Sequence, residues 1–298
     1  MKWLVARVTL LLLCCIGLTS CDFIQVTGDV PVTVAPTAAR PTTQVAVPTW
    51  TALPTATTAV PSLTAIVPDT GWELLRPGLE RRIVNLLSED DEHAEQLYML
   101  RLEPGRFRFG VAYDPKLRSL DAWQAETDAL LLVNGGYFRQ EGDTYVPNGL
   151  TVVDGKAMGT SYGSFGGMLA VTPGGLELRW LAQAPYDPQE NLLAALQSFP
   201  VLVKPGGEVG FPEQYEDGRR ARRTVIGQDN SGRILFVIAS RGYFTLHQLS
   251  VYLTQSDLEL KLAINLDGGT SSGLLLASPA EKVPAYIPLP VVITVHPR

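Results

Sequence analysis

Apolar and polar positions between residues 71 and 298 alternate in short runs that predict strands separated by turns. Strands are expected over residues 96–102, 106–112 and 129–133, and a helix is expected over residues 119–128. Glycine-rich turn signals follow at Pro147–Gly149, Val153–Gly155, Gly163–Gly167 and Pro173–Gly175. Because each turn is flanked by short apolar stretches, we expect an antiparallel meander in this region.

The last third of the chain predicts a strand, a helix and a second strand. Residues 233–240 and 262–266 form buried apolar runs, and residues 245–256 between them repeat leucine at helical spacing. This pattern indicates a β-α-β unit with a right-handed crossover, whose second strand delivers Asp267 to the sheet edge. Residues 191–198 also favour a helix. The expected fold class is therefore α+β or mixed α/β, a single domain with a mixed β-sheet flanked by helices.

The first residues are typical of an export signal. Lys2 and Arg7 precede an apolar stretch, residues 8–18, that is shorter than the roughly 20 residues needed to span a bilayer. The stretch ends L-T-S-C at Cys21, which resembles a bacterial lipobox. We expect residues 1–20 to be a lipoprotein signal peptide and Cys21 to be the lipidation site. The lipid would anchor the chain to the extracytoplasmic face of the cell membrane. An ordinary signal peptide is the alternative.

Composition separates the segment after Cys21 from the remainder. Residues 21–70 are rich in Pro, Thr, Val and Ala with hardly a charge, which is typical of a disordered extended linker. Residues 71–298 are long enough for one sizeable core. The three cysteines lie at or before Cys21, so no thiol chemistry is available to this domain. A net charge of −6 argues against a nucleic-acid partner.

Two buried strands are expected to end in the same way. Residues 133–138 read V-N-G-G-Y-F and residues 265–272 read N-L-D-G-G-T-S-S, each placing a polar residue, Asn134 or Asp267, before two glycines. Asp-Gly is also a common hairpin signal. Glycines at strand ends allow a ligand to approach the backbone closely, so a shared site is the functional alternative.

Four arginines form a cluster in G-R-R-A-R-R-T-V-I-G, at Arg219, Arg220, Arg222 and Arg223. In an acidic chain they are a candidate anion clamp, because a guanidinium grips phosphate or carboxylate with paired hydrogen bonds. A solvated basic loop is the alternative.

A competing pattern is G-T-S-S-G, which matches the nucleophile elbow of serine esterases at Ser271, with Glu281 and His296 following in chain order. The proline-rich sequence after the motif does not suit that fold.

The three histidines have no metal-ligand spacing, so no cofactor or metal site is expected, and the sequence does not indicate a divalent cation.

The motifs at residues 133–138, 223–227 (R-T-V-I-G) and 265–272 together resemble the phosphodiester glycosidase family. The resemblance runs from about Leu97 to Val295. Thr270 departs from the small residue that the family usually has at that position. The resemblance implies hydrolysis of the bond between a sugar and a phosphodiester, in which a phosphate monoester leaves.

Combined with the chemistry of these residues, the resemblance implies three catalytic residues. Asp267 is the carboxylate that activates water or stabilises the developing cation, Arg223 binds the phosphate, and Asn134 positions Asp267 or holds a sugar hydroxyl. Tyr137 or Phe138 would stack on the sugar. The remaining substrate-binding candidates are Gly135, Gly136, Gly268 and Gly269, through their N–H groups, and Thr224, Asn265, Ser271 and Ser272. Spacing does not select Glu126 or Asp128 as a second carboxylate.

The expected function is thus a surface-anchored hydrolase that cleaves a sugar from a sugar-1-phosphodiester, with an envelope or extracellular glycan as substrate. The first alternative is a lipoprotein that binds anionic glycans without cleaving them. The second is a serine esterase that uses Ser271.

Overall fold

The computed structural model describes residues 64–66, 69–87 and 93–298. The chain divides into residues 1–55 and residues 56–298, and all of the described residues belong to the second unit. The expected signal peptide, Cys21 and nearly all of the expected linker lie outside the described residues.

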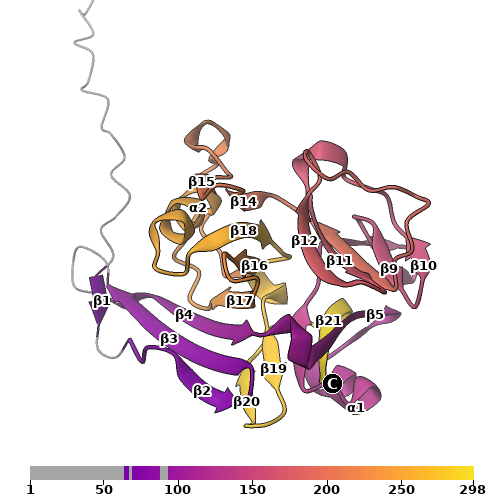
Figure 1. Cartoon of the computed structure of the whole chain (residues 1–298), viewed down its shortest axis with the longest axis horizontal. Helices are drawn as coiled ribbons and strands as arrows, with labels where there is room; N and C mark the ends of the chain where they lie inside the picture. Colours follow the sequence, from indigo (N-terminus) through magenta and orange to yellow (C-terminus); the bar gives the residue numbers. More distant parts are fainter. Residues whose placement is uncertain (1–63, 67–68, 88–92) are drawn as a thin grey trace, which may run out of the picture. The chain divides into compact units, whose positions relative to one another are not determined.

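One large sheet of nine strands runs through the described part of the chain. Its strands are β1 (Thr64–Ile66), β2 (Glu73–Arg76), β3 (Leu79–Leu87), β4 (His93–Leu102), β14 (Val201–Lys204), β15 (Glu208–Val209), β16 (Arg223–Asp229), β17 (Ile234–Ala239) and β18 (Leu260–Asn265). Their order is β1-β3-β4-β17-β16-β18-β14-β15, with β2 beside β3. In Figure 1 the purple strands β2–β4 continue the sheet away from the orange and yellow strands.

Two smaller five-stranded sheets complete the arrangement, together with the hairpin of β7 (Phe138–Glu141) and β8 (Thr144–Pro147). The first has the order β20-β19-β6-β21-β5, with β5 (Phe107–Arg118), β6 (Leu131–Asn134), β19 (Leu274–Leu276), β20 (Glu281–Val283) and β21 (Leu289–Pro297). The second has the order β10-β9-β13-β11-β12, with β9 (Thr151–Val153), β10 (Lys156–Met158), β11 (Gly167–Thr172), β12 (Gly175–Trp180) and β13 (Ala194–Ser198).

The expected α+β or mixed α/β class is wrong. The described residues contain two α-helices, α1 (Leu120–Thr127) and α2 (Leu246–Gln255), and the strands form several antiparallel sheets, so the structure is mostly β. Residues 194–198, expected to be helical, form β13, in which all five residues are buried between β9 and β11. Because β13 is buried on both faces, including its polar residues Gln197 and Ser198, its sequence shows no alternation between an apolar and a polar face, which explains the error.

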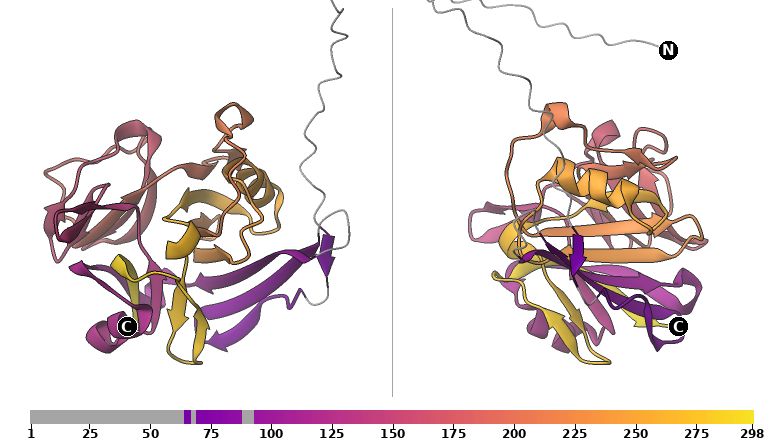
Figure 2. Two further views of the ribbon diagram at one scale, coloured as in Figure 1. Left: turned by 180° about the vertical axis from the view of Figure 1, so that it is seen from behind. Right: turned by 90° about the vertical axis from the view of Figure 1, so that its left-hand side faces the viewer.

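The expected β-α-β unit exists in a modified form. β17 and β18 are connected through α2, but both pair with β16, which lies between them and is antiparallel to each. The capping box of Thr245 and Gln248 begins α2, and Leu249 and Leu253 pack onto the large sheet. Figure 2 shows α2 lying across the strands of this sheet. Among the described residues, no helix is long and apolar enough to cross a membrane.

One hydrophobic core joins the three sheets. Leu100 and Phe236 come from the large sheet, Leu131 from the first smaller sheet and Leu196 from the second, and none of the four is more than 2% exposed. Burial of such side chains contributes about 1.5–3 kcal/mol each. Leu266, the residue before Asp267, belongs to the same core, so packing fixes the loop that follows β18.

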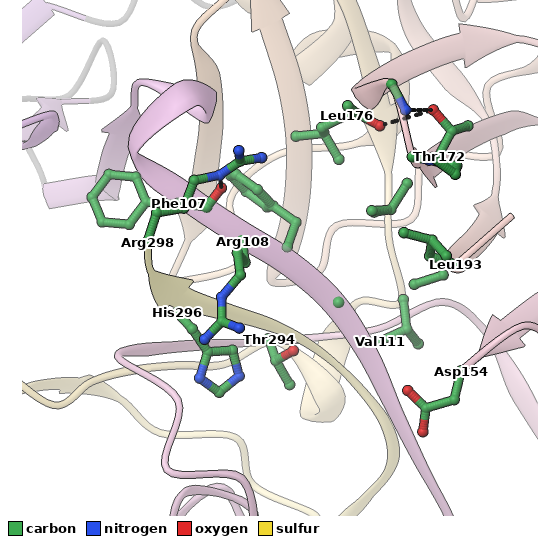
Figure 3. A pocket seen from close by; sticks show the side chains of 17 residues that line it. Phe107, Arg108, Val111, Asp154, Thr172, Leu176, Leu193, Thr294, His296 and Arg298 are labelled. Atoms are coloured by element: carbon green, nitrogen blue, oxygen red, sulfur yellow. Dashed lines mark hydrogen bonds between the residues drawn. The ribbon is translucent and has the colours of Figure 1, made fainter.

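A cavity of about 720 Å³ lies between β5, the C-terminal part of β21 and the β11–β12 turn (Figure 3). Arg108 and His296 line one side of it, and Leu176 and Leu193 line another. On β21, His296 is the partner of Arg108, whereas Val292 is the partner of Asn134. The cavity therefore lies at the end of β21 away from the predicted site.

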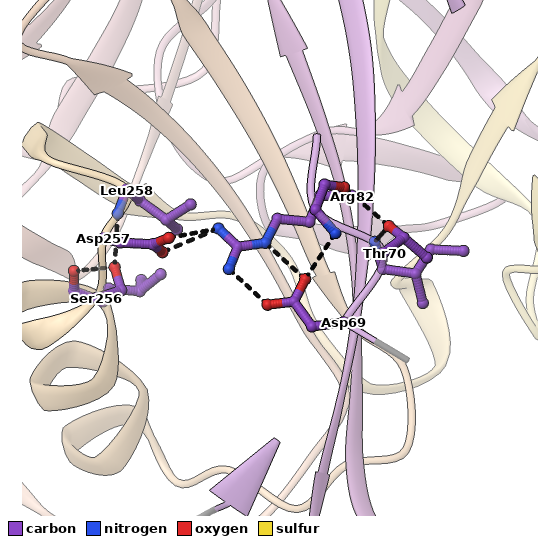
Figure 4. Close-up of polar contacts among 9 residues, drawn as sticks. Asp69, Thr70, Arg82, Ser256, Asp257 and Leu258 are labelled. Atoms are coloured by element: carbon purple, nitrogen blue, oxygen red, sulfur yellow. Dashed lines mark hydrogen bonds and ion pairs between the residues drawn. The ribbon is translucent and has the colours of Figure 1, made fainter. Parts of the chain in front are cut away.

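Arg82 ties the first part of the domain to the loop before β18 (Figure 4). Its Nε and Nη2 atoms donate to the Asp69 carboxylate at 2.9 and 2.7 Å, and Nη1 donates to Asp257 at 2.8 Å. The hydrogen bond from Arg82 lowers the pKa of Asp69. The two carboxylates therefore fix β3 against the turn that leads into β18.

Candidate functional site

The loops after β6 and β18 meet, although the two strands belong to different sheets. The N–H of Asp267 donates to the carbonyl of Gly135 at 3.1 Å, and that of Asn134 donates to the carbonyl of Gly273 at 3.1 Å. The Asp-Gly sequence is not a hairpin turn, because β18 pairs with β14 and β16 whereas β19 pairs with β6 and β20. The structure thus brings the two glycine junctions together.

Asn134 is 0% exposed, and its side chain is saturated by hydrogen bonds within the protein. Its Oδ1 atom accepts from the Thr224 hydroxyl at 2.7 Å and from the Gly273 N–H at 3.1 Å. Its Nδ2 atom donates to the carbonyls of Asp267 at 2.7 Å and Gly135 at 3.2 Å. Two donors and two acceptor sites are the capacity of an amide. Asn134 and Thr224 are therefore placed to position Asp267 rather than to hold a sugar hydroxyl.

The Asp267 carboxylate is the titratable group that these contacts position. Its Oδ1 atom accepts from the Gly268 N–H at 2.9 Å, and the Ser271 hydroxyl also donates to it. Burial raises its pKa above the ordinary value of 3.8, and the two hydrogen bonds offset part of that effect. Burial disfavours the charged form, so this carboxylate binds a proton more readily than an exposed one.

Ser271 and the other members of the esterase pattern lie apart. The Ser271 hydroxyl donates a hydrogen bond to Asp267. The Glu281 carboxylate accepts a hydrogen bond from the Tyr98 hydroxyl at 2.5 Å and forms an ion pair with Arg81. His296 lies four residues beyond the β21 partner of Asn134, about 13 Å along the strand. The structure therefore does not assemble a catalytic triad around Ser271.

Most of the predicted backbone donors are already used. The N–H of Gly135 donates to Val291, that of Gly268 to the Asp267 side chain and that of Gly269 to the carbonyl of Arg222. Glycine at 268 permits this packing, because a Cβ there would lie 2.9 Å from the Arg222 carbonyl oxygen. The negative charge of a bound ligand must therefore be stabilised mainly by side chains.

The side chains of the arginine cluster, which lies just before and at the start of β16, point in different directions. Arg223 is 7% exposed, and its Nη2 atom donates to the carbonyl of Arg219 at 2.7 Å. Arg222 points elsewhere: Nη2 donates to the carbonyl of Pro284 at 2.9 Å, and the guanidinium lies 4.3 Å from the ring centre of Tyr286. None of the ion pairs among the described residues includes a member of the cluster. Within the described part of the chain, Arg223 is thus a buried cation that forms no ion pair, although the charges of Glu216 and Asp217 act on it.

Tyr137 is influenced by both the acidic and the basic residue of the site. Burial, together with the negative charge of Asp267, raises its pKa to about 12, while Arg223 acts in the opposite direction. Its hydroxyl accepts a hydrogen bond from Nδ2 of Asn265 at 2.8 Å, so its own proton is available to another acceptor. Its ring packs against Phe199 with 4.7 Å between centroids. The geometry favours Tyr137 as a hydrogen-bond donor.

Sequence reasoning missed two aromatic residues beside Tyr137. Tyr162, from the loop before β11, packs on Phe199 with 4.9 Å between centroids. Its hydroxyl is buried and has no hydrogen-bond partner among the described residues, and burial with the nearby Tyr137 and Asp267 raises its pKa to about 12. Both residues come from the second smaller sheet or its loops, and no local motif connects them with the two glycine junctions.

Two further predicted residues are buried deeper. Asn265 and Ser272 are each 0% exposed. Asn265 donates a hydrogen bond to Tyr137, and Oγ of Ser272 has no hydrogen-bond partner in the part of the chain that the structure describes. Glu126 and Asp128 precede β6, at the end opposite to Asn134, so they are not second carboxylates of this site. Within the described residues, no three His, Cys, Asp or Glu side chains converge in a way that suits a metal ion.

Comparison with known families and structures gives the following matches. The profile of the family described as phosphodiester glycosidase matches residues 127–294. This segment contains both glycine junctions, β16 and α2. No curated protein sequence matches the chain significantly.

Two solved structures share the fold at low sequence identity. The catalytic domain of zebrafish N-acetylglucosamine-1-phosphodiester alpha-N-acetylglucosaminidase, auto-inhibited by its pro-peptide, is similar with a TM-score of 0.59 and 18% identity, over 79% of this chain and 88% of that one. A hypothetical protein from Synechocystis is similar with a TM-score of 0.51 and 13% identity, over 80% of this chain and 64% of that one. At these identities the likeness establishes the fold alone.

Proposed function

Because this chain belongs to the phosphodiester glycosidase family, we propose that it hydrolyses the bond between the anomeric carbon of a sugar and a phosphodiester. The observation that carries the proposal is the carboxylate of Asp267, held at the junction of two strand ends with a raised pKa. Arg223 is a buried cation that forms no ion pair among the described residues, and the charges of Asp267 and Arg223 both act on Tyr137, in opposite directions.

In the proposed reaction, water attacks the anomeric carbon and Asp267 accepts one of its protons. The bond from the anomeric carbon to the phosphate oxygen breaks, and its electron pair leaves with the phosphate. The products are a free sugar and a phosphate monoester. A phosphate is a good leaving group, so charge stabilisation matters more than proton donation.

Three side chains support this step. Arg223 binds the phosphate, and its planar guanidinium suits two phosphate oxygens at once. Tyr137 remains protonated at neutral pH because its pKa is about 12, and its free proton is available to a phosphate oxygen or a sugar hydroxyl. Asn134 fixes the backbone of Asp267, which holds the base in place.

The test is release of phosphate monoester from a panel of sugar-1-phosphodiesters by the full chain, with and without divalent ions. Asp267→Asn is expected to abolish turnover, because an amide cannot accept the proton from water. Asp154→Asn, at an exposed turn, is the matched control and is expected to keep full activity. Full turnover by Asp267→Asn contradicts the assigned role.

A binding protein for anionic glycans is the second candidate, since it uses the same residues. The observation in its favour is that no second carboxylate contacts Asp267 among the described residues. Binding of every panel member without turnover, weakened by Arg223→Lys, supports this candidate instead.

We further propose that the chain acts at the extracytoplasmic face of a membrane, anchored through Cys21. The support is the lipobox-like sequence that ends at Cys21. Labelled palmitate is expected to be incorporated into the parent chain and not into Cys21→Ser. Equal labelling of both chains contradicts the anchor.

A further inference from the structure

A groove lined by aromatic side chains opens beside the proposed catalytic site. Its volume is about 450 Å³. The apolar residues that line it are Phe165, Trp180, Phe199, Pro200, Val201, Phe211, Pro212 and Tyr215. Polar lining side chains are few: Ser164, Lys204 and Gln214.

The groove is continuous with the site through Phe199. One neighbour of the Phe199 ring is Tyr137, and another is Phe165 in the groove, at 5.6 Å between centroids. The carbonyl of Phe199 accepts a hydrogen bond from Asn265 at 3.1 Å. Phe199 therefore contacts both the site residue Tyr137 and the groove residue Phe165.

The groove also continues toward the side of the site that carries positive charge. Tyr215 forms part of its wall and lies four residues before Arg219 in the same loop. The carbonyl of Arg219 holds the guanidinium of Arg223. Glu216, which follows Tyr215, also acts on the charge of Arg223, so this wall of the groove lies near the cation proposed to bind phosphate.

The chemistry of the lining selects an apolar ligand. Phe165 is 58% exposed and Tyr215 is 65% exposed, so two large aromatic side chains face solvent within one groove. Lys204 lies over the ring of Trp180 at 5.2 Å, which leaves little polar capacity in the groove. A ligand rich in hydroxyl groups would leave most of them without partners there, whereas a hydrocarbon gains from burial.

We propose that this groove binds the group on the far side of the phosphate, and that this group is a hydrocarbon chain. The proposal rests on the proposed function, because it assumes that Arg223 holds a phosphate. The substrate class is then a sugar joined through phosphate to an alkyl or isoprenoid alcohol, and the second product is an alkyl phosphate.

Binding of octyl phosphate and methyl phosphate to the full chain, measured by calorimetry, tests the groove without any sugar. Each buried methylene is worth about fourfold in affinity, so a groove that covers three of them favours octyl phosphate by about 60-fold. Phe165→Ser and Tyr215→Ser are each expected to remove most of this preference. Leu74→Ser is the matched control, because Leu74 is 70% exposed on β2, away from the groove, and it is expected to keep the preference.

Equal affinity for the two phosphates overturns the proposal, as does a preference that survives the Phe165→Ser and Tyr215→Ser double variant. Tighter, Phe165-dependent binding of a hexose 6-phosphate than of octyl phosphate overturns the apolar assignment in favour of a sugar. The proposed function fails separately. If octyl phosphate binds as expected but no sugar-1-phosphodiester is hydrolysed, the result supports the binding groove and contradicts the proposed glycosidase reaction.

Discussion

Replacement of Asn134 by alanine tests whether one buried amide joins the two glycine junctions. The substitution leaves the Gly273 N–H, the Thr224 hydroxyl and the Asp267 carbonyl without their partner. Each buried polar group left unpaired costs about 1–3 kcal/mol. Because a water molecule can enter the space and neighbouring costs are not additive, we expect a total loss of about 3–5 kcal/mol in the free energy of unfolding.

Thr224→Val is the graded comparison for this experiment. It removes only one hydrogen bond, and the Oδ1 atom of Asn134 keeps the Gly273 N–H as a donor. The expected loss is about 1 kcal/mol. Urea unfolding of the full chain, followed by intrinsic fluorescence, measures both values, and turnover is expected to fall in kcat rather than KM because Asp267 loses its support. If Asn134→Ala costs no more than Thr224→Val, the amide does not join the two loops.

Three further predictions concern charge, pH and close packing. Arg223→Lys is expected to lower kcat/KM for phosphodiesters by at least about tenfold more than for neutral aryl glycosides, because the ammonium cannot bind two oxygens in parallel. Arg222→Lys is the control and is expected to affect both substrate classes alike. Steady-state kinetics on the two substrate classes measures both effects. Since the folded-state pKa of Asp267 is raised, ionisation destabilises the folded protein, and this cost appears as pH rises from 3.8 through the folded-state pKa. Asp267→Asn is therefore expected to be more stable than the parent at pH 7 and to lose that advantage below pH 3.8, whereas the activity of the parent falls on acidification. Thermal unfolding that shows the same difference in stability between the two chains at every pH argues against a raised pKa. Gly268→Ala places a Cβ 2.9 Å from the Arg222 carbonyl oxygen and is expected to cost about 1–3 kcal/mol in urea unfolding, whereas Gly174→Ala, with only a side-chain atom 3.5 Å away, is expected to cost less.

The sequence was informative where a local rule and the tertiary structure agree. The helix over residues 245–256 was predicted because its leucines are spaced for one face, and α2 buries that face against the large sheet. The two glycine junctions were recognisable because each combines a polar side chain with glycines after a buried run. The expectation that they share a site is consistent with the hydrogen bond from Asp267 to Gly135.

The fold class was wrong because it depended on pairings that local patterns do not encode. The strand over residues 194–198 is buried on both sides, so its sequence resembles that of a buried helix. The strand-helix-strand pattern predicted a β-α-β unit, but it did not show that β16 lies between β17 and β18 and pairs antiparallel with both.

The same limit applies within the site. Tyr162 and Phe199 reach Tyr137 from a different sheet, so no spacing in the sequence links them. The four arginines form one cluster in the sequence, but only Arg223 belongs to β16, and Arg222 in the loop before it points instead toward Pro284 and Tyr286.

Hydrolysis in water enriched in the heavy oxygen isotope tests most directly where the substrate bond breaks. With a turned-over sugar-1-phosphodiester, attack at the anomeric carbon places the heavy oxygen in the released sugar and none in the phosphate monoester, as determined by mass spectrometry of both products. That distribution is the predicted result. Heavy oxygen in the phosphate monoester contradicts the proposed reaction, because it means that water attacks phosphorus instead.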